Sequence, residues 1–353
     1  MPAKHQTHTK TKTKTKTKTI LVSAWFKMSL WALLMTVAHS AAGAAHTFDP
    51  ADSAPGNMRF SWIHGSLSAK ANQDVRIQVH RYNEHTYILR QNPAVHWEAP
   101  FMYLLFGNDS ALLLDVGASA EAEHFPLRAT VDAVIKRWQD ANGKTNTGLL
   151  VVPLGDDVSQ TQALDQFKDR SNTRIVRPTE RAREQLLGLP SWPEQNTDLD
   201  LGGRILTLIP TPGLSAQALS IYDHWGDLLF TGNSFYPGRL VIRDFEAYRT
   251  SLKRLISLTE QQPVRWVMGG RIEMSAHPGM DYRLRANFRP MEHVLQLPSE
   301  QLAEAFDAVQ LMNGRQDIRI LNDFILMHGV GRGARDYGYP VFVPEQFRQV
   351  RLR

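Results

Sequence analysis

The sequence contains no cysteine among its 353 residues. This absence excludes disulfides, thiolate metal ligands, iron–sulfur clusters and a cysteine nucleophile. The chain also lacks a Gly-x-Ser-x-Gly elbow, a phosphate-binding loop and a dinucleotide fingerprint, so it carries no motif for serine-hydrolase, nucleotide or dinucleotide chemistry. With 42% hydrophobic and 21% charged residues, its composition is that of a globular protein whose stability comes from core burial.

Acidic residues are missing from the start of the chain, where the first one is Asp49. Residues 1–44 hold seven of the 40 basic residues, and the remaining 33 face 35 acidic ones, a formal charge of −2. The net charge of +5 and the pI of about 9.4 therefore belong to the leader. Because the rest of the chain has no basic excess and its tryptophans are not interleaved with basic residues, we expect no nucleic-acid partner.

Residues 1–44 are typical of a basic leader and signal peptide. A Thr/Lys repeat (8–19) precedes an apolar run (20–38), and the small residues Ala42-Gly43-Ala44 follow. We expect cleavage after Ala44, a periplasmic or secreted protein, and no stable membrane association after cleavage. The alternative is an uncleaved anchor formed by residues 20–38. Met28 could equally be the true start.

The remaining chain divides into three predicted segments. Residues 45–77 are polar and rich in Gly, Ser and Pro, which indicates a flexible N-terminal segment. Residues 78–275 alternate short β-rich runs with amphipathic helices, as expected for two sheets flanked by helices. One helical face is marked by Leu127, Val131, Val134, Ile135 and Trp138. Residues 276–353 predict a C-terminal helical extension, with one helix near 298–312.

Five motifs of the central segment occur in a characteristic order. They are LLLDVG, LLVV, LGGRILTLIPTPG, LLFTGNSF and WVMGG, spread over about residues 78–275. In this order they resemble the metallo-β-lactamase-fold hydrolases. The resemblance implies an α/β fold, the four-layer αββα metallo-β-lactamase-like sandwich, and in active members one or two zinc-type ions. In that family the bound hydroxide attacks an ester, thioester, amide or phosphate.

The metal ligands that the resemblance implies are absent at nearly every position. Family members carry His-x-His-x-Asp-His after the LLVV-type strand, a His after Thr-Pro-Gly, a bridging Asp after Thr-Gly and a His at the end of the last strand. The corresponding residues here are Gly155, Asp157, Ser159, Gln160, Leu214, Asn233 and Arg271. A shifted register of the first loop instead places Val152, Leu154, Asp156 and Asp157 at its four positions. Neither register contains a histidine.

One acid of the family pattern is kept. Asp115 in LLLDVG matches a structural acid that lies beside the metal ligands in family members, and so it supports the fold more than the chemistry. Adjacent acids such as Asp156 and Asp157 are more often an exposed turn or a helix cap than metal ligands. His224, His277 and His293 are interpreted as turn, capping or surface residues, whereas His96 could line the cleft.

Two interpretations of function follow. The first is an exported protein that has lost its metal centre and hydrolase activity and keeps the cleft as a binding surface for a small molecule or protein, with no cofactor. The second is a hydrolase of the ester, thioester or lactone class with an altered, mononuclear zinc-type site built from Asp156, Asp157, Asn233 and one further residue that the sequence does not identify. Arg271 sharpens the first, because its guanidinium could replace the charge of the metal by pairing with Asp157 or Asp156. The alternative is an Arg271 turned toward solvent.

Overall fold

The computed structural model describes residues 45–49, 51, 55–68, 70, 72–189 and 191–334. The predicted leader and the last 19 residues lie outside the described residues. Of the helices in the described part of the chain, none combines the length and the apolar character that a membrane crossing requires.

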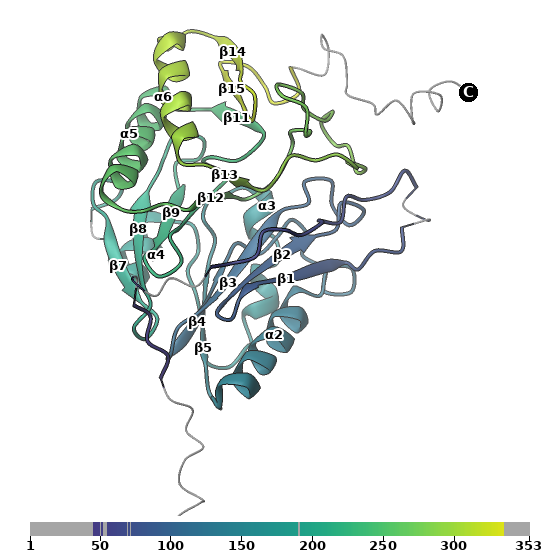
Figure 1. The fold of residues 1–353 in the computed structure, drawn as a ribbon, viewed down its shortest axis with the longest axis vertical. Helices are drawn as coiled ribbons and strands as arrows, with labels where there is room; N and C mark the ends of the chain where they lie inside the picture. Colours follow the sequence, from purple (N-terminus) through teal and green to yellow (C-terminus); the bar gives the residue numbers. More distant parts are fainter. Residues whose placement is uncertain are drawn as a thin grey trace, which may run out of the picture.

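The first sheet has six strands in sequential order, antiparallel from β1 to β4 and parallel from β4 to β6. Its strands are β1 (Ile77–Asn83), β2 (Thr86–Gln91), β3 (Phe101–Phe106), β4 (Ser110–Leu114), β5 (Gly148–Val152) and β6 (Thr173–Ile175). The connections hold α2 (Leu127–Asn142), α3 (Val158–Thr161) and the 3₁₀ turn η3 (Leu164–Phe167). In Figure 1 this half of the molecule, coloured purple to teal, carries α2 on its outer face.

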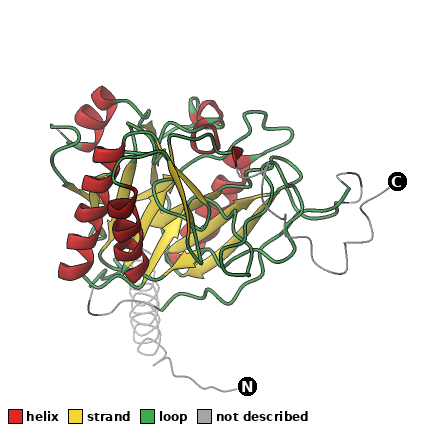
Figure 2. Cartoon of the chain, turned by 90° about the horizontal axis from the view of Figure 1, so that it is seen from above, coloured by secondary structure: helices red, strands yellow, loops and turns green. Residues whose placement is uncertain are grey.

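The second sheet also has six strands, in the order β13-β12-β10-β9-β8-β7. They are β7 (Thr197–Asp200), β8 (Ile205–Pro210), β9 (Leu219–Asp223), β10 (Leu228–Gly232), β12 (Trp266–Gly269) and β13 (Gln296–Leu297). The helix α4 (Glu180–Leu187) precedes this sheet, and α5 (Phe245–Gln261) and α6 (Glu300–Met312) pack together on its outer side. Figure 2 shows the two long helices on one flank and the sheets in the middle.

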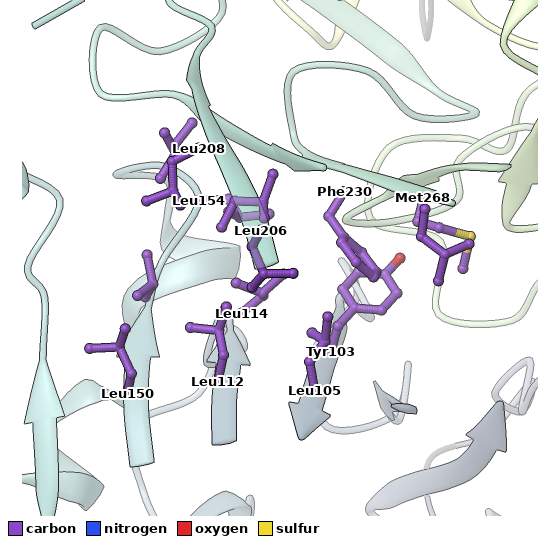
Figure 3. Packing of buried hydrophobic residues seen from close by; sticks show 14 of the residues in the cluster. Tyr103, Leu105, Leu112, Leu114, Leu150, Leu154, Leu206, Leu208, Phe230 and Met268 are labelled. Carbon is purple, nitrogen blue, oxygen red and sulfur yellow. The ribbon is translucent and has the colours of Figure 1, made fainter. Parts of the chain in front are cut away.

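Alternation along the strands builds three apolar layers. In β3, Tyr103 and Leu105 face the second sheet, whereas Leu104 and Phe106 face α2, because successive side chains point to opposite faces. Figure 3 shows the central layer, in which Leu112, Leu114 and Tyr103 point toward side chains of the opposite sheet such as Leu206 and Phe230. A third cluster joins the second sheet to α5 and α6. The predicted four-layer αββα arrangement is confirmed.

The helix predictions agree closely with the structure. The five residues predicted to form one helical face are the buried residues of α2. In α5, the buried apolar side chains Tyr248, Leu252 and Leu255 follow the spacing of one helical face. The side chain of Asp244 accepts a hydrogen bond from the Ala247 N–H and so caps this helix at its start.

The segment after Ser275 contains more than the predicted helix. Besides α6, it adds β13 to the second sheet and forms β14 (Asp317–Ile320) and β15 (Ile325–His328). These two strands make a third sheet with β11 (Arg239–Ile242), in the order β11-β15-β14. The sequence did not indicate them, because strands of two to four residues are too short to show a period. In residues 45–77, the side chains of Phe48 and Ile63 are buried, and most of the other described residues before β1 are exposed or half-buried.

Candidate functional site

A cavity of about 210 Å³ opens where the loops after β5, β8 and β10 meet β11. Its apolar lining consists of Leu154, Leu214, Ala218 and Val241, and its charged lining of Asp156, Asp157, Arg239, Arg243, Arg271 and Arg332. Seven of the residues at the positions that the resemblance implies line this cavity: Leu154, Asp156, Asp157, Gln160, Leu214, Asn233 and Arg271.

The loop after β5 holds the first group of predicted site residues. Asp157 precedes α3 as its cap residue and is half-buried, whereas Asp156 is exposed and accepts a hydrogen bond from the Ser215 hydroxyl (2.6 Å). Gly155 lies against Gln160, since a Cβ at Gly155 would come 2.5 Å from Gln160 Oε1. In the alternative register, Val152 and Leu154 are buried in the layer between the sheets. Neither offers a ligand atom.

Gln160 is engaged by Asp115. Asp115 follows β4 with a φ of 60°, a left-handed conformation that Asp tolerates better than most residues. Its carboxylate accepts hydrogen bonds from the Leu154 N–H (2.7 Å) and from Gln160 Nε2 (3.1 and 3.2 Å). Burial raises the pKa of Asp115 to about 7, against the opposing effect of these hydrogen bonds. The acid therefore ties the loop after β5 to β4, a structural role that agrees with its place in the motif.

Asn233 and Ser159 contact each other. Asn233 Nδ2 donates to the Ser159 Oγ at 2.9 Å. The Oδ1 of Asn233 is buried and accepts no hydrogen bond within the described structure. Leu214, after the Thr-Pro-Gly turn, is half-buried and packs against the apolar layer under α5. The preceding Gly213 is required there, because a Cβ would collide with the backbone of Tyr248 at 2.5 Å.

Arg271 points inward, as the charge-replacement hypothesis predicts. Its side chain is 5% exposed, and it pairs with Asp157 (Nη2–Oδ2, 3.4 Å) and with Glu98 (Nη1–Oε1, 2.6 Å). Its guanidinium also lies 4.9 Å from the centroid of the Tyr236 ring. Burial and the nearby Arg332 act to lower the pKa of Arg271, but Tyr236 and the acids outweigh them, so the pKa is raised and the side chain stays cationic.

A second arginine, Arg332, extends this network from the C-terminal segment. It shares Glu98 with Arg271 (Nη1–Oε1, 2.6 Å) and also pairs with Glu273 through Nη2. Glu273 in turn accepts hydrogen bonds from the Arg239 N–H (2.8 Å) and the Tyr236 hydroxyl (3.2 Å).

The arginines hold the neighbouring acids in their charged form. Burial acts to raise the pKa of Glu273, but Arg332 and Arg271 lower it to about 2. For Asp157 burial acts in the same sense, and the same two arginines bring its pKa below the usual value. The site is thus an arginine–carboxylate network in which both signs of charge are fixed near neutral pH.

The residues at the family's ligand positions do not fit a zinc-type ion. Such an ion needs three or four converging imidazole, carboxylate or thiolate donors. Here Leu214 has no lone pair, Gln160 is held by Asp115, and Arg271 places a permanent cation in the cavity. Among the described residues no group of three or more His, Asp or Glu could hold a metal ion. The mononuclear site predicted from Asp156, Asp157, Asn233 and one unidentified residue gains no further donor here, since the described residues that line the cavity include no histidine and no other carboxylate.

Sequence reasoning missed several residues of the site. Glu98 and Arg332 lie far from Arg271 in the chain. Glu273, two residues after Arg271, belongs to no motif. The pair Arg239 and Arg243 left no clear signal, because three consecutive apolar residues separate the two arginines in RLVIR. Of the histidines, His96 lies outside the lining of the cavity. His224 contacts Thr207 (2.8 Å) beside the β9–β10 turn, and His293 pairs with Asp323 (2.7 Å).

Comparison with known proteins finds a partial match to one curated protein. No family model matches the chain. The acyl-coenzyme A thioesterase MBLAC2 of Gallus gallus is 31% identical over 134 residues, which are 36% of this chain and 48% of that protein. The chain thus spans about half the length of this curated relative.

Solved structures similar to the chain share little sequence with it. A metallo-β-lactamase from Pontibacter korlensis matches at a TM-score of 0.44 and 15% identity, covering 66% of this chain and 99% of its own. A metallo-β-lactamase superfamily protein from Sulfolobus tokodaii matches at 0.38 and 18%, covering 68% and 88%. The DIM-1 metallo-β-lactamase matches at 0.39 and 12%, covering 57% and 91%.

Proposed function

We propose that this chain, which has the metallo-β-lactamase fold, is a metal-free variant of a hydrolase-like protein and keeps the cleft as a binding pocket for a small molecule. The observation that carries the proposal is the buried Arg271, paired with Asp157 and Glu98 where the family's last strand ends in a histidine. A guanidinium in this place supplies the positive charge that would otherwise come from the metal.

The same charge opposes metal binding. Two unit charges 4 Å apart at an effective dielectric constant near 20 interact by about 4 kcal/mol, and a divalent ion doubles that repulsion. Asp157 already has a cationic partner, so an incoming ion would have to displace Arg271 from it. Glu98 holds the guanidinium in place from the other side.

Metal content tests this proposal directly. The purified protein is analysed by elemental mass spectrometry before and after incubation with Zn²⁺, Mn²⁺ and Fe²⁺. We expect far less than one metal per chain and a melting temperature unchanged within about 1 °C. An ion that binds, at a concentration about 100 times its dissociation constant, would raise the free energy of unfolding by about 2.7 kcal/mol. Stoichiometric retained metal together with a raised melting temperature would refute the proposal.

A second candidate function is a thioester hydrolase with an altered metal site. The match to a thioesterase over 134 residues favours it. Thiol release from acyl-coenzyme A can be followed with a thiol-reactive chromogen, and the chain itself gives no background because it has no cysteine. Turnover that is abolished by a chelator would establish this candidate. We expect the same slow background release with and without the protein.

We further propose export to the periplasm or secretion. The support is the basic leader and apolar run in residues 1–44, which lie outside the described residues. N-terminal sequencing of the protein recovered outside the cytoplasm should start at Ala45. Recovery only in the membrane fraction with residues 20–38 intact would favour the anchor instead.

A further inference from the structure

The pocket receives one side chain from the last described segment of the chain. Arg332 lies in residues 329–334, the sequence GVGRGA, which we call the strap. Gly329, Gly331 and Ala334 are exposed, whereas the Arg332 side chain is only 21% exposed and lines the cavity. The strap is thus a surface segment that extends one cation into the pocket.

The groups around the Arg332 guanidinium are those that recognise a planar cation. Its Nη1 donates to Glu98 Oε1 (2.6 Å), and its Nη2 donates to Glu273 Oε1. Its Cζ lies over the Trp97 ring, 5.2 Å from the centroid. Both carboxylates are buried, so their pairing with a cation is stronger than on the surface, and the aromatic face adds to the attraction. These three residues therefore form a guanidinium subsite, which Arg332 occupies.

The residues next to Arg332 allow it to leave this subsite. The Arg332 carbonyl accepts from Arg239 Nη1 (2.9 Å), whereas the Ala334 N–H bonds back to the Gly331 carbonyl inside the strap. Neither space nor conformation requires glycine at 331, because a Cβ would meet nothing within 4 Å and φ lies outside the left-handed region. Glycine at this position gives the strap more conformational freedom than a residue with a side chain would.

Both acids of the subsite keep another partner when Arg332 leaves. Glu98 Oε1 also accepts from Arg271 Nη1 (2.6 Å), and Glu273 accepts from the Arg239 backbone N–H (2.8 Å). Two guanidinium groups on the same oxygen repel each other, which weakens the hold on Arg332. Withdrawal of Arg332 therefore costs less than breaking a buried pair whose acid has no second partner.

The charges of the network determine which ligand can replace Arg332. In the ion pairs of the site, Arg271 and Arg332 face the acids Asp157, Glu98 and Glu273. Without Arg332, a neutral or anionic ligand would leave buried negative charge uncompensated. A cation in the same place restores the balance, and a guanidinium also restores both hydrogen bonds.

We propose that Arg332 is a built-in inhibitor of the pocket that occupies the subsite of a small organic guanidinium compound. Such a compound displaces Arg332, and its guanidinium pairs with Glu98 and Glu273 beside the Trp97 ring. This inference rests on the proposed binding function and specifies the ligand class and its regulation.

Calorimetry with a variant that empties the subsite tests the ligand class. Arg332→Ala removes the atoms of ethylguanidinium, which is therefore the probe, with uncharged ethylurea as its control. We expect the variant to bind ethylguanidinium about tenfold or more tightly than ethylurea, because the charge-assisted hydrogen bonds are lost with the urea. The unmodified protein should bind ethylguanidinium about tenfold or more weakly than the variant, since Arg332 leaves the subsite open for only a small fraction of the time. Arg315→Ala, at an exposed arginine outside the cavity lining, should bind like the unmodified protein.

A label on the strap separates a displaceable arginine from a fixed structural one. Because the chain has no cysteine, Ala334→Cys provides a single, exposed site for a nitroxide spin label. Saturating ethylguanidinium should make this label more mobile in the electron paramagnetic resonance spectrum, whereas ethylurea should not. Gly331→Ala, which adds no contact, should weaken ethylguanidinium binding by about two- to fivefold, because it restricts the released strap.

Three results would overturn this inference: no binding of ethylguanidinium to the Arg332→Ala variant, equal binding of ethylurea, or an unchanged spectrum of the label. The label experiment retains Arg332 and stays decisive even if the Arg332→Ala variant folds poorly. The metal measurement alone decides the metal-free proposal, so the two proposals can fail independently.

Discussion

Two buried arginines, Arg204 and Arg271, occupy opposite kinds of environment. Arg204 donates five hydrogen bonds. Two go to Asp223 (2.5 and 3.1 Å), two to the His85 and Phe106 carbonyls (2.7 and 3.1 Å) and one to Thr86 Oγ1 (2.8 Å). Arg271 contacts Glu98, Asp157 and Ser159, and its Nε has no partner within the described structure.

The comparison separates a structural ion pair from a site. Arg204 and Asp223 are both fully buried, and Arg204 is absent from the cavity lining described above. The hydrogen bonds given above satisfy the guanidinium and the carboxylate within the protein. Arg271 lines the cavity, and its Nε makes no hydrogen bond within the described residues. A buried charge by itself therefore says little about function. A buried arginine that lines a cavity and keeps an unpaired donor is the more informative feature.

The largest expected effect comes from breaking the satisfied pair. Asp223→Asn leaves Arg204 charged and uncompensated in the core, which should lower the free energy of unfolding by about 3–5 kcal/mol. Urea unfolding at pH 7 measures the loss. Asp227→Asn is the matched control, because its pair with Arg265 is longer (3.6 Å) and partly exposed, and we expect less than about 1 kcal/mol.

The stability of the region around Arg204 should also depend on pH. His85 packs beside Trp225 and accepts a hydrogen bond from Trp138 Nε1 (3.1 Å), and burial, together with His46 and Arg204, lowers its pKa to about 3. Because the unfolded chain takes up this proton near pH 6.5 and the folded one only near pH 3, stability falls as the pH drops through this window.

Comparison with a His85→Gln variant isolates the contribution of that histidine. Between pH 7 and pH 4 the unmodified protein should lose about 3 kcal/mol more stability than the variant, which keeps an acceptor for Trp138 and does not titrate. Urea unfolding at the two pH values measures the difference. Equal losses would show that the folded protein and the unfolded chain protonate His85 equally readily, and that burial does not lower its pKa.

A smaller effect on stability than that of Asp223→Asn is expected at the pocket. Arg271→Gln should lower the free energy of unfolding by only about 1–2 kcal/mol, because Glu98 keeps Arg332 as a partner and Asp157 is half-exposed to water. The same urea measurement gives this value. A loss as large as that of Asp223→Asn would mean that Arg271 is a structural residue like Arg204, and the distinction between the two regions would fail.

Local pattern was enough to predict most of the layered fold. The face of α2 and the alternation in the central strands are repeated over enough residues to show their period. The short strands β13 to β15 were not predictable, since they form only by pairing with β11 and β12. Their presence changes the site, because the segment that carries them brings Arg332 to the cavity.

The sequence by itself determined that the residues at the positions implied by the resemblance are not the usual metal ligands. A leucine, an asparagine and an arginine at those positions exclude the usual ligand set whatever their geometry. Only the tertiary structure decided which side chains these residues contact. Arg271 meets Glu98 across 173 residues and shares that acid with Arg332, 234 residues from it. No local pattern encodes such pairings, because burial and charge compensation arise only once distant segments are packed together.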